Sequence, residues 1–113
     1  MESDTASEGS AHTGPIIFAD ETARSQLVEE GEVVTFRADD RTTGDTWWRK
    51  SRTGEKQGNV HIAEIGSIHV PNLDEFRLYA ELSGFASATA WRDAVYQLHG
   101  EITTGWFYRV TER

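Results

Sequence analysis

Short runs in which apolar and polar side chains alternate recur along the chain and predict five β-strands. The clearest run follows Gly31, where Val34 and Phe36 share one face of a predicted strand and Thr35 and Arg37 share the other. In the longest run the apolar phase slips near residue 66, which indicates a bulge or a bend. The predicted strands cover residues 15–18, 32–38, 46–50, 59–70 and 106–110.

Apolar side chains at helical spacing predict three helices between these strands. The strongest pattern is that of Trp91, Ala94, Val95 and Leu98, which follow one another at i, i+3, i+4 and i+7. The predicted helices are a first one capped by Asp20 or Thr22 and stopped at Gly31, with Ala23, Leu27 and Val28 inward, a second from about Leu73 to Leu82 capped by Asn72, and a third from Ser87 to Gly100.

The elements follow the order β-α-β-β-β-α-α-β, which predicts an α+β fold. We expect a small mixed sheet of about five strands, curled into a partial β-barrel and flanked by helices. Residues 1–14 contain no large apolar side chain after Met1 and are predicted to form a disordered tail, so the domain is expected over residues 15–113. Its core is expected to contain Val34, Phe36, Ile62, Trp91, Val95, Leu98 and Tyr108.

The charge balance is strongly acidic, with 19 Asp and Glu against 11 Lys and Arg and a net charge of −8. Acid-rich chains with few lysines are typical of proteins that stay soluble in concentrated salt, where charge repulsion is screened. The composition therefore favours a halophilic protein of haloarchaeal type, with an ordinary acidic protein as the alternative. The chain has no Cys, no signal-like start and no apolar stretch of bilayer length. We therefore expect a cytoplasmic protein with no membrane partner.

Motifs for covalent chemistry or a bound cofactor are missing from the sequence. It contains neither the Gly-x-Ser-x-Gly nucleophile turn nor a phosphate-binding glycine loop. His61 and His69 lie on one predicted strand, but no carboxylate joins them at ligand spacing, so we expect ordinary surface or core histidines. The sequence predicts no metal, no cofactor and no catalytic residue, and it favours a monomer.

Residues 37–56 form the basic part of this acidic chain, with six bases and four acids. Aromatic and basic side chains interleave there, which favours nucleic acid, because bases stack on indole rings while Arg reaches phosphates. Trp47 and Trp48 would point to opposite faces of a strand, so we expect one in the core and one exposed. Two alternatives stay open: both rings pack in the barrel or on its edge, or Arg37 and Arg41 pair with neighbouring aspartates.

The segment Gly31-Glu-Val-Val-Thr-Phe-Arg37 resembles the signature of the ASCH domain, a PUA-like β-barrel family, in which a Gly-x-Lys-Thr-x-Thr-x-Arg-like run follows the first helix. Three later features are similar as well: Gly44-Asp45 in the following loop, the stretch Leu82-Ser-Gly-Phe-Ala-Ser87 before the third helix, and the aromatic strand at 106–110. The resemblance covers about residues 16–111. It implies a cleft beside the barrel that binds RNA or nucleotides.

Some bacterial members of that family remove the acetyl group from N4-acetylcytidine with a Lys, a Thr and a Glu. The Thr is matched by Thr35, but the Lys position aligns with Glu32, and the Glu position falls near Ser83, two residues after Glu81. An acid in place of the cation inverts the electrostatics that activate a hydroxyl or hold an oxyanion. The resemblance therefore implies binding rather than hydrolysis, with a nucleoside amidohydrolase as an alternative.

The function expected from the sequence is thus an RNA- or nucleotide-binding module. We expect strands 32–38 and 46–50 to be antiparallel neighbours whose side chains converge on one nucleotide. The net charge favours a different class, a protein-interaction or regulatory domain, because nucleic-acid binders are usually basic. The predicted binding residues are Thr35, Arg37, Arg41, Trp47, Trp48, Arg49, Lys50 and Arg52.

Overall fold

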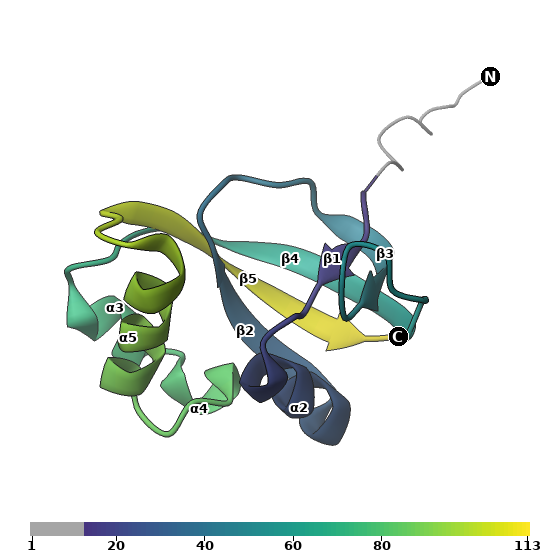
Figure 1. Cartoon of the computed structure of the whole chain (residues 1–113), viewed down its shortest axis with the longest axis horizontal. Coiled ribbons are helices and arrows are strands. Elements are labelled where there is room, and N and C mark those ends of the chain that lie inside the picture. Colours follow the sequence, from purple (N-terminus) through teal and green to yellow (C-terminus); the bar gives the residue numbers. More distant parts are fainter. Residues whose placement is uncertain (1–12) are drawn as a thin grey trace.

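A computed structural model describes residues 13–113 and contains one curled, five-stranded sheet with four helices, which confirms the α+β partial barrel (Figure 1). The strands are β1 (Ile16–Ile17), β2 (Glu32–Arg37), β3 (Gly44–Arg49), β4 (Gly58–His69) and β5 (Thr104–Glu112). The helices are α2 (Glu21–Glu30), α3 (Leu73–Arg77), α4 (Ala80–Ser83) and α5 (Ala88–His99).

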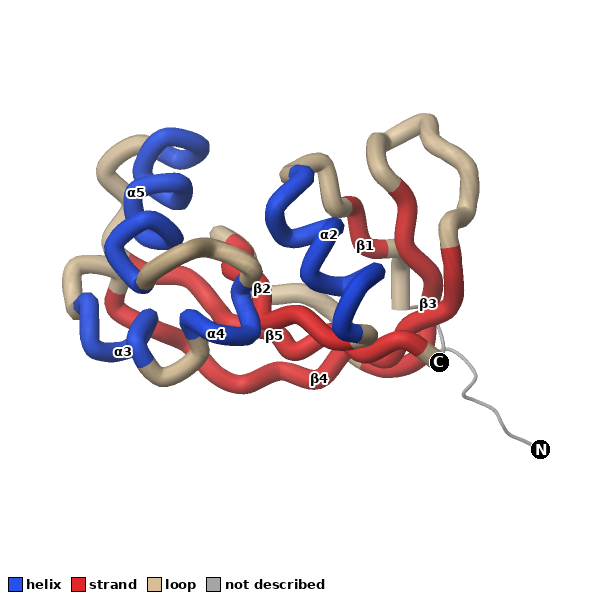
Figure 2. The backbone as a smooth tube through the Cα atoms, turned by 90° about the horizontal axis from the view of Figure 1, so that it is seen from below, coloured by secondary structure: helices blue, strands red, loops and turns tan. Residues whose placement is uncertain are grey.

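The strand order in the sheet is β1-β3-β4-β5-β2, so β1 and β2 form its edges. The pairings are antiparallel except for β1 with β3, which is parallel. Figure 1 shows α3, α4 and α5 grouped at one end of the sheet, with α2 beside β2. In Figure 2, α2 and α5 rise on the same side of the strands, one on each side of β2.

One extra residue in β4 divides the interior into two cores. Glu64 lies opposite Tyr108 and Gly66 opposite Phe107, so Ile65 has no partner in the register. Because side chains alternate between the two faces of a strand, this insertion moves the even-numbered residues of β4 to the other face. Ile62 therefore packs in one core and Ile68 in the other.

The first core fills the concave side of the sheet beneath α2, and its members include Ile16, Leu27, Val33, Ile62 and Tyr108. The second core lies between the sheet and the α3–α5 group. Its centre is Phe107, which stacks on Trp91 with ring centroids 4.7 Å apart and meets Phe76 edge to face. Strand β2 separates the two cores, because its Val33 packs in the first while Val34 and Phe36 pack in the second.

The local signals at the helix ends are confirmed. Asp20, Asn72 and Ser87 each accept a hydrogen bond from a main-chain N–H in the first turn of the helix that follows, as N-caps do. Gly31 ends α2 in the left-handed conformation, with φ of 78°, which costs a glycine little.

Three expectations about the helices are wrong. Leu98 was expected in the core but is 78% exposed, and Val28 is 55% exposed, since α2 buries only the narrow stripe of Ala23 and Leu27. The helix expected from about Leu73 to Leu82 is two short helices, because the chain leaves helical geometry at Tyr79, with φ of −126° and ψ of 10°.

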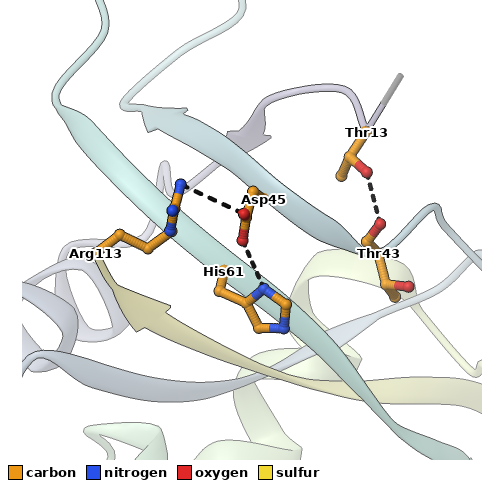
Figure 3. Close-up of polar contacts among 5 residues, drawn as sticks. All are labelled: Thr13, Thr43, Asp45, His61 and Arg113. Carbon is orange, nitrogen blue, oxygen red and sulfur yellow. Dashed lines mark hydrogen bonds and ion pairs between the residues drawn. The ribbon is translucent and has the colours of Figure 1, made fainter. Parts of the chain in front are cut away.

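The expected tail lies outside the described residues except for its last two, which are hydrogen-bonded to the domain. The Thr13 hydroxyl donates to the Thr43 carbonyl at 2.6 Å (Figure 3). The Thr13 carbonyl accepts from the Thr46 hydroxyl at 2.9 Å. The Gly14 carbonyl accepts from Arg41 Nη2 at 2.7 Å. On the same part of the sheet, Asp45 binds both His61 and Arg113, as Figure 3 also shows.

These contacts predict that two truncations differing by two residues have different stabilities. A chain lacking residues 1–14 loses the three bonds of Thr13 and Gly14, while a chain lacking residues 1–12 keeps them. We expect the longer deletion to lower the free energy of unfolding by about 1–2 kcal/mol relative to the shorter one, since each exposed bond contributes little. Urea unfolding of both chains measures this, and equal midpoints would contradict it.

Candidate functional site

A cleft of about 240 Å³ lies where the two cores meet, across the C-terminal end of β2. One wall is the segment from Ile17 to Asp20, which leads from β1 into α2, and the opposite wall is α5 with Phe85. Residues 35–38 form the floor. The cleft thus occupies the region between α2 and α5 that is visible in Figure 2.

Arg37 is the cation of this cleft, and it is placed there by strand alternation. Its side chain leaves β2 on the same face as Thr35 and reaches over the ring of Phe18, with the guanidinium carbon 5.2 Å from the ring centroid. Its Nε atom is shielded from solvent and has no hydrogen-bond partner among residues 13–113. Within the same residues, the guanidinium forms no ion pair with a carboxylate.

The electrostatic surroundings of Arg37 disfavour its charge. Burial, followed by the nearby positive charge of Arg41, lowers the pKa of Arg37 from 12.5 to about 10. The side chain is still protonated at neutral pH, because that value lies well above 7. A partly desolvated cation that forms no ion pair is costly, so an acceptor or an anion entering the cleft would gain more from this half-buried group than from an exposed Arg.

The remaining lining is mostly apolar. Trp91 and Val95 contribute buried surface from α5, Phe36 contributes from β2, and the exposed Leu98 stands at the rim. Thr35 is 8% exposed and brings a hydroxyl group to the lining. A planar ring could therefore contact apolar walls while Thr35 and Arg37 supply hydrogen bonds.

The other predicted binding residues do not join this cleft. Strand β3 pairs with β4 and β1, while β2 pairs with β5, so the expectation that the two are antiparallel neighbours is wrong. The connection after β2 is long enough to carry the chain across the barrel rather than back alongside β2. Thr35 and Arg37 therefore line the cleft without Trp47, Trp48, Arg49, Lys50 or Arg52.

The two tryptophans point to opposite faces of β3, as strand alternation predicts. Trp48 is 4% exposed and meets Phe18 edge to face in the first core, which makes it a structural residue. Trp47 is partly exposed, and the guanidinium carbon of Arg49 lies 5.3 Å from the centroid of its ring. Lys50 and Arg52 are exposed at the end of this strand.

Arg41 holds the loop after β2 in place. Its side chain donates to the carbonyls of Gly14 and Thr42, and its main-chain N–H donates to the Tyr108 hydroxyl at 2.8 Å. The same hydroxyl donates to Asp40 at 2.9 Å, and burial is the main cause that raises the pKa of Tyr108 to about 12. Arg41 acts on the cleft through its charge, which lowers the pKa of Arg37.

The positions that align with hydrolase residues are also outside the cleft. The Glu32 carboxylate lies 3.5 Å from Nε of Arg109. The Ser83 hydroxyl is buried within its own turn, where it donates to Ala80 and accepts from the N–H of Phe85. Glu81 is exposed. Thr35 has neither a lysine nor a glutamate beside it in the cleft lining.

The sequence reasoning missed the wall formed by α5. Its apolar period was attributed to core packing alone, although Leu98 is exposed at the rim and His99 lies against Phe36 with ring centroids 5.7 Å apart. An exposed Leu at the end of an otherwise buried stripe marks such a rim only after the neighbouring strand is placed. The pattern itself contained no signal for it.

Comparison of the chain with family models, curated proteins and solved structures gives no match. The described residues contain no helix that is both long and apolar enough to cross a membrane. Within the same range, no group of three or more His, Asp or Glu is arranged to hold a metal ion. The functional argument therefore rests on the cleft and its chemistry.

The cost of the Arg37 charge predicts the effect of removing it. Arg37→Met keeps a long, flexible side chain against Phe18, and we expect the free energy of unfolding at neutral pH to rise by about 1 kcal/mol, as when other buried charges are replaced by apolar groups. Arg49→Met is the matched control, because Arg49 also packs on an aromatic ring with an unbonded Nε among the described residues. Denaturant unfolding measures both; a loss above 1 kcal/mol for Arg37→Met would reveal a structural partner.

Proposed function

We propose that this protein binds a nucleotide, or a single unpaired RNA base, in the cleft between α2 and α5. The observation that carries the proposal is the Arg37 guanidinium, a half-buried cation that forms no ion pair among the described residues and whose shielded Nε has no partner there, set in a mostly apolar cleft. Such a group stabilises a ligand that brings a hydrogen-bond acceptor together with a flat apolar body. Nucleobases combine these two properties.

The size of the cleft supports one base rather than a longer segment. Its volume of about 240 Å³ lies just below the range of about 300–1,000 Å³ that is usual for drug-sized ligands. The net charge of −8 also disfavours a long track of phosphate contacts, which basic proteins make. Insertion of one base, with the rest of the molecule outside, agrees with both properties.

The resemblance to the ASCH domain adds support, because that family is expected to bind RNA or nucleotides beside its barrel. Thr35 and Arg37, the two residues of the signature that are matched here, both line the cleft. A halophilic setting would favour this kind of site. At about 1 M salt the Debye length is only about 3 Å, so ring contacts and short hydrogen bonds persist while long-range attraction is lost.

Arg37→Met is also the variant that tests the proposal, with Arg49→Met as its control. We expect the full chain to bind nucleosides, and Arg37→Met to weaken that binding at least tenfold, because a hydrogen bond to a charged group contributes about 1.5–3 kcal/mol. Thr35→Val should weaken it by a smaller factor. Titration calorimetry in concentrated salt, with uridine, cytidine, adenosine and guanosine, measures these effects.

The control variant separates this site from the surface of β3. If Arg49→Met or Trp47→Ala weakens the binding of single-stranded RNA while Arg37→Met does not, the ligand binds at β3 and the cleft is not the site. If neither nucleosides nor RNA bind the folded chain, nucleotide binding is excluded and the interaction-domain reading replaces it.

A further inference from the structure

The cleft contains main-chain hydrogen-bonding groups as well as side chains, because its floor is an edge strand. Strand β2 pairs only with β5, so half of its N–H and C=O groups point away from the sheet. One hydrogen bond at the start of the strand shows which residues have their N–H and C=O groups on the open side. The N–H of Glu112 donates to the carbonyl of Gly31 at 2.9 Å, which makes the facing residues Glu32 and Thr111 a pair without direct hydrogen bonds.

The alternation then continues along the strand. Val33, Thr35 and Arg37 exchange main-chain hydrogen bonds with their partners on β5, whereas Glu32, Val34 and Phe36 direct their main-chain groups to the open edge. The position of Gln26 agrees with this phase, because its Nε2 donates to the Glu32 carbonyl at 3.2 Å from outside the sheet.

Phe36 is therefore a buried residue of the cleft lining whose main-chain groups point to the open edge of the strand. It is 8% exposed, it lines the cleft, and no other described residue bonds its N–H or C=O. Most buried main-chain groups in proteins have partners, so an unpartnered pair at a cleft is a reason to look for a ligand that supplies them.

We propose that the edge of β2 selects a ring bearing an acceptor–donor–acceptor edge, the pattern of a uracil-type imide; this inference rests on the proposed nucleotide binding. The groups follow one another along the strand. The Phe36 N–H donates to one ring carbonyl, the Phe36 C=O accepts from the ring N–H, and the Arg37 guanidinium donates to the second carbonyl. The ring thus takes the place of a neighbouring strand at Phe36.

This order of groups discriminates against the other bases. Cytosine presents a donor, then two acceptors, so it would set an acceptor against the Phe36 carbonyl or a donor against its N–H. Guanine begins with an acceptor and a donor but ends with an amino group, which would face the guanidinium donors. Adenine has no carbonyl and no ring N–H on this edge, where it presents only an amino donor and a ring-nitrogen acceptor. A site whose buried polar groups are left unpaired by the wrong ligand rejects that ligand strongly.

The cleft gives the phosphate no comparable site. Arg37 is the single Arg or Lys in its lining, and the ring carbonyl occupies it. A phosphate attached to the ribose would lie outside, so its presence should matter little for affinity.

The experiment compares uridine, 3-methyluridine, cytidine and uridine 5′-monophosphate by titration calorimetry on the full chain. We expect uridine to bind at least tenfold more tightly than cytidine and 3-methyluridine, and within threefold of the monophosphate. In Arg37→Met the preference for uridine over cytidine should fall. Exchange of the Phe36 amide with D₂O, followed by NMR, should slow with saturating uridine and stay unchanged with 3-methyluridine.

The outcomes separate the two proposals. If 3-methyluridine or cytidine binds as tightly as uridine and loses affinity in Arg37→Met, nucleosides bind in the cleft but the edge of β2 does not read them. An unchanged Phe36 amide in the presence of tightly bound uridine also overturns the imide inference alone. If no nucleoside binds, both the imide inference and the proposed function are wrong.

Discussion

The unpaired Ile65 in β4 is the constraint on which the rest of the structure depends. A sheet of this size with uninterrupted alternation presents one apolar face, and one layer of helices covers it. The insertion instead gives β4 two apolar faces in succession, Ile62 on one and Ile68 on the other. The helices divide accordingly, with α2 over the first core and the α3–α5 group over the second. The cleft exists because these two groups of helices cover different parts of the sheet.

Strand β2 has the unusual position between the cores, and this explains its composition. Val33 and Val34 are both almost fully buried, since each faces one of the cores. Thr35 and Arg37 follow Val33 on the face that packs in the first core, at the point where apolar side chains no longer cover that face. An Arg at that point destabilises the folded chain unless something in the cleft compensates its charge. Sites of this kind are where proteins carry features that lower stability in favour of function.

The sequence was sufficient for features that local chemistry controls. The caps Asp20 and Asn72, the glycine stop at Gly31 and the bulge near Gly66 all follow from short-range preferences, and the structure has each of them. The order of the strands could not be predicted in this way. Alternation in β2 and β3 shows that each strand has an apolar face, but it does not show which strand lies beside it. The expected site combined Arg37 with Arg49 for that reason, although β4 and β5 lie between their strands. Leu98 was predicted in the core for a similar reason. The helical period of apolar residues does not distinguish a core position from a position at the rim of a cleft.

The acidic net charge and the half-buried Arg37 together define how a ligand would be selected under the proposed function. With a net charge of −8, the protein repels polyanions at long range, and salt screens this repulsion. Arg37 acts only at short range, on a group that has already left water and entered the cleft. The energetic gain then depends on fitting hydrogen bonds to fixed partners, the guanidinium and the edge of β2, and not on total charge. Under the proposed function, an acidic protein can therefore recognise one base of a polyanion, because affinity and selectivity both arise at the same few buried groups.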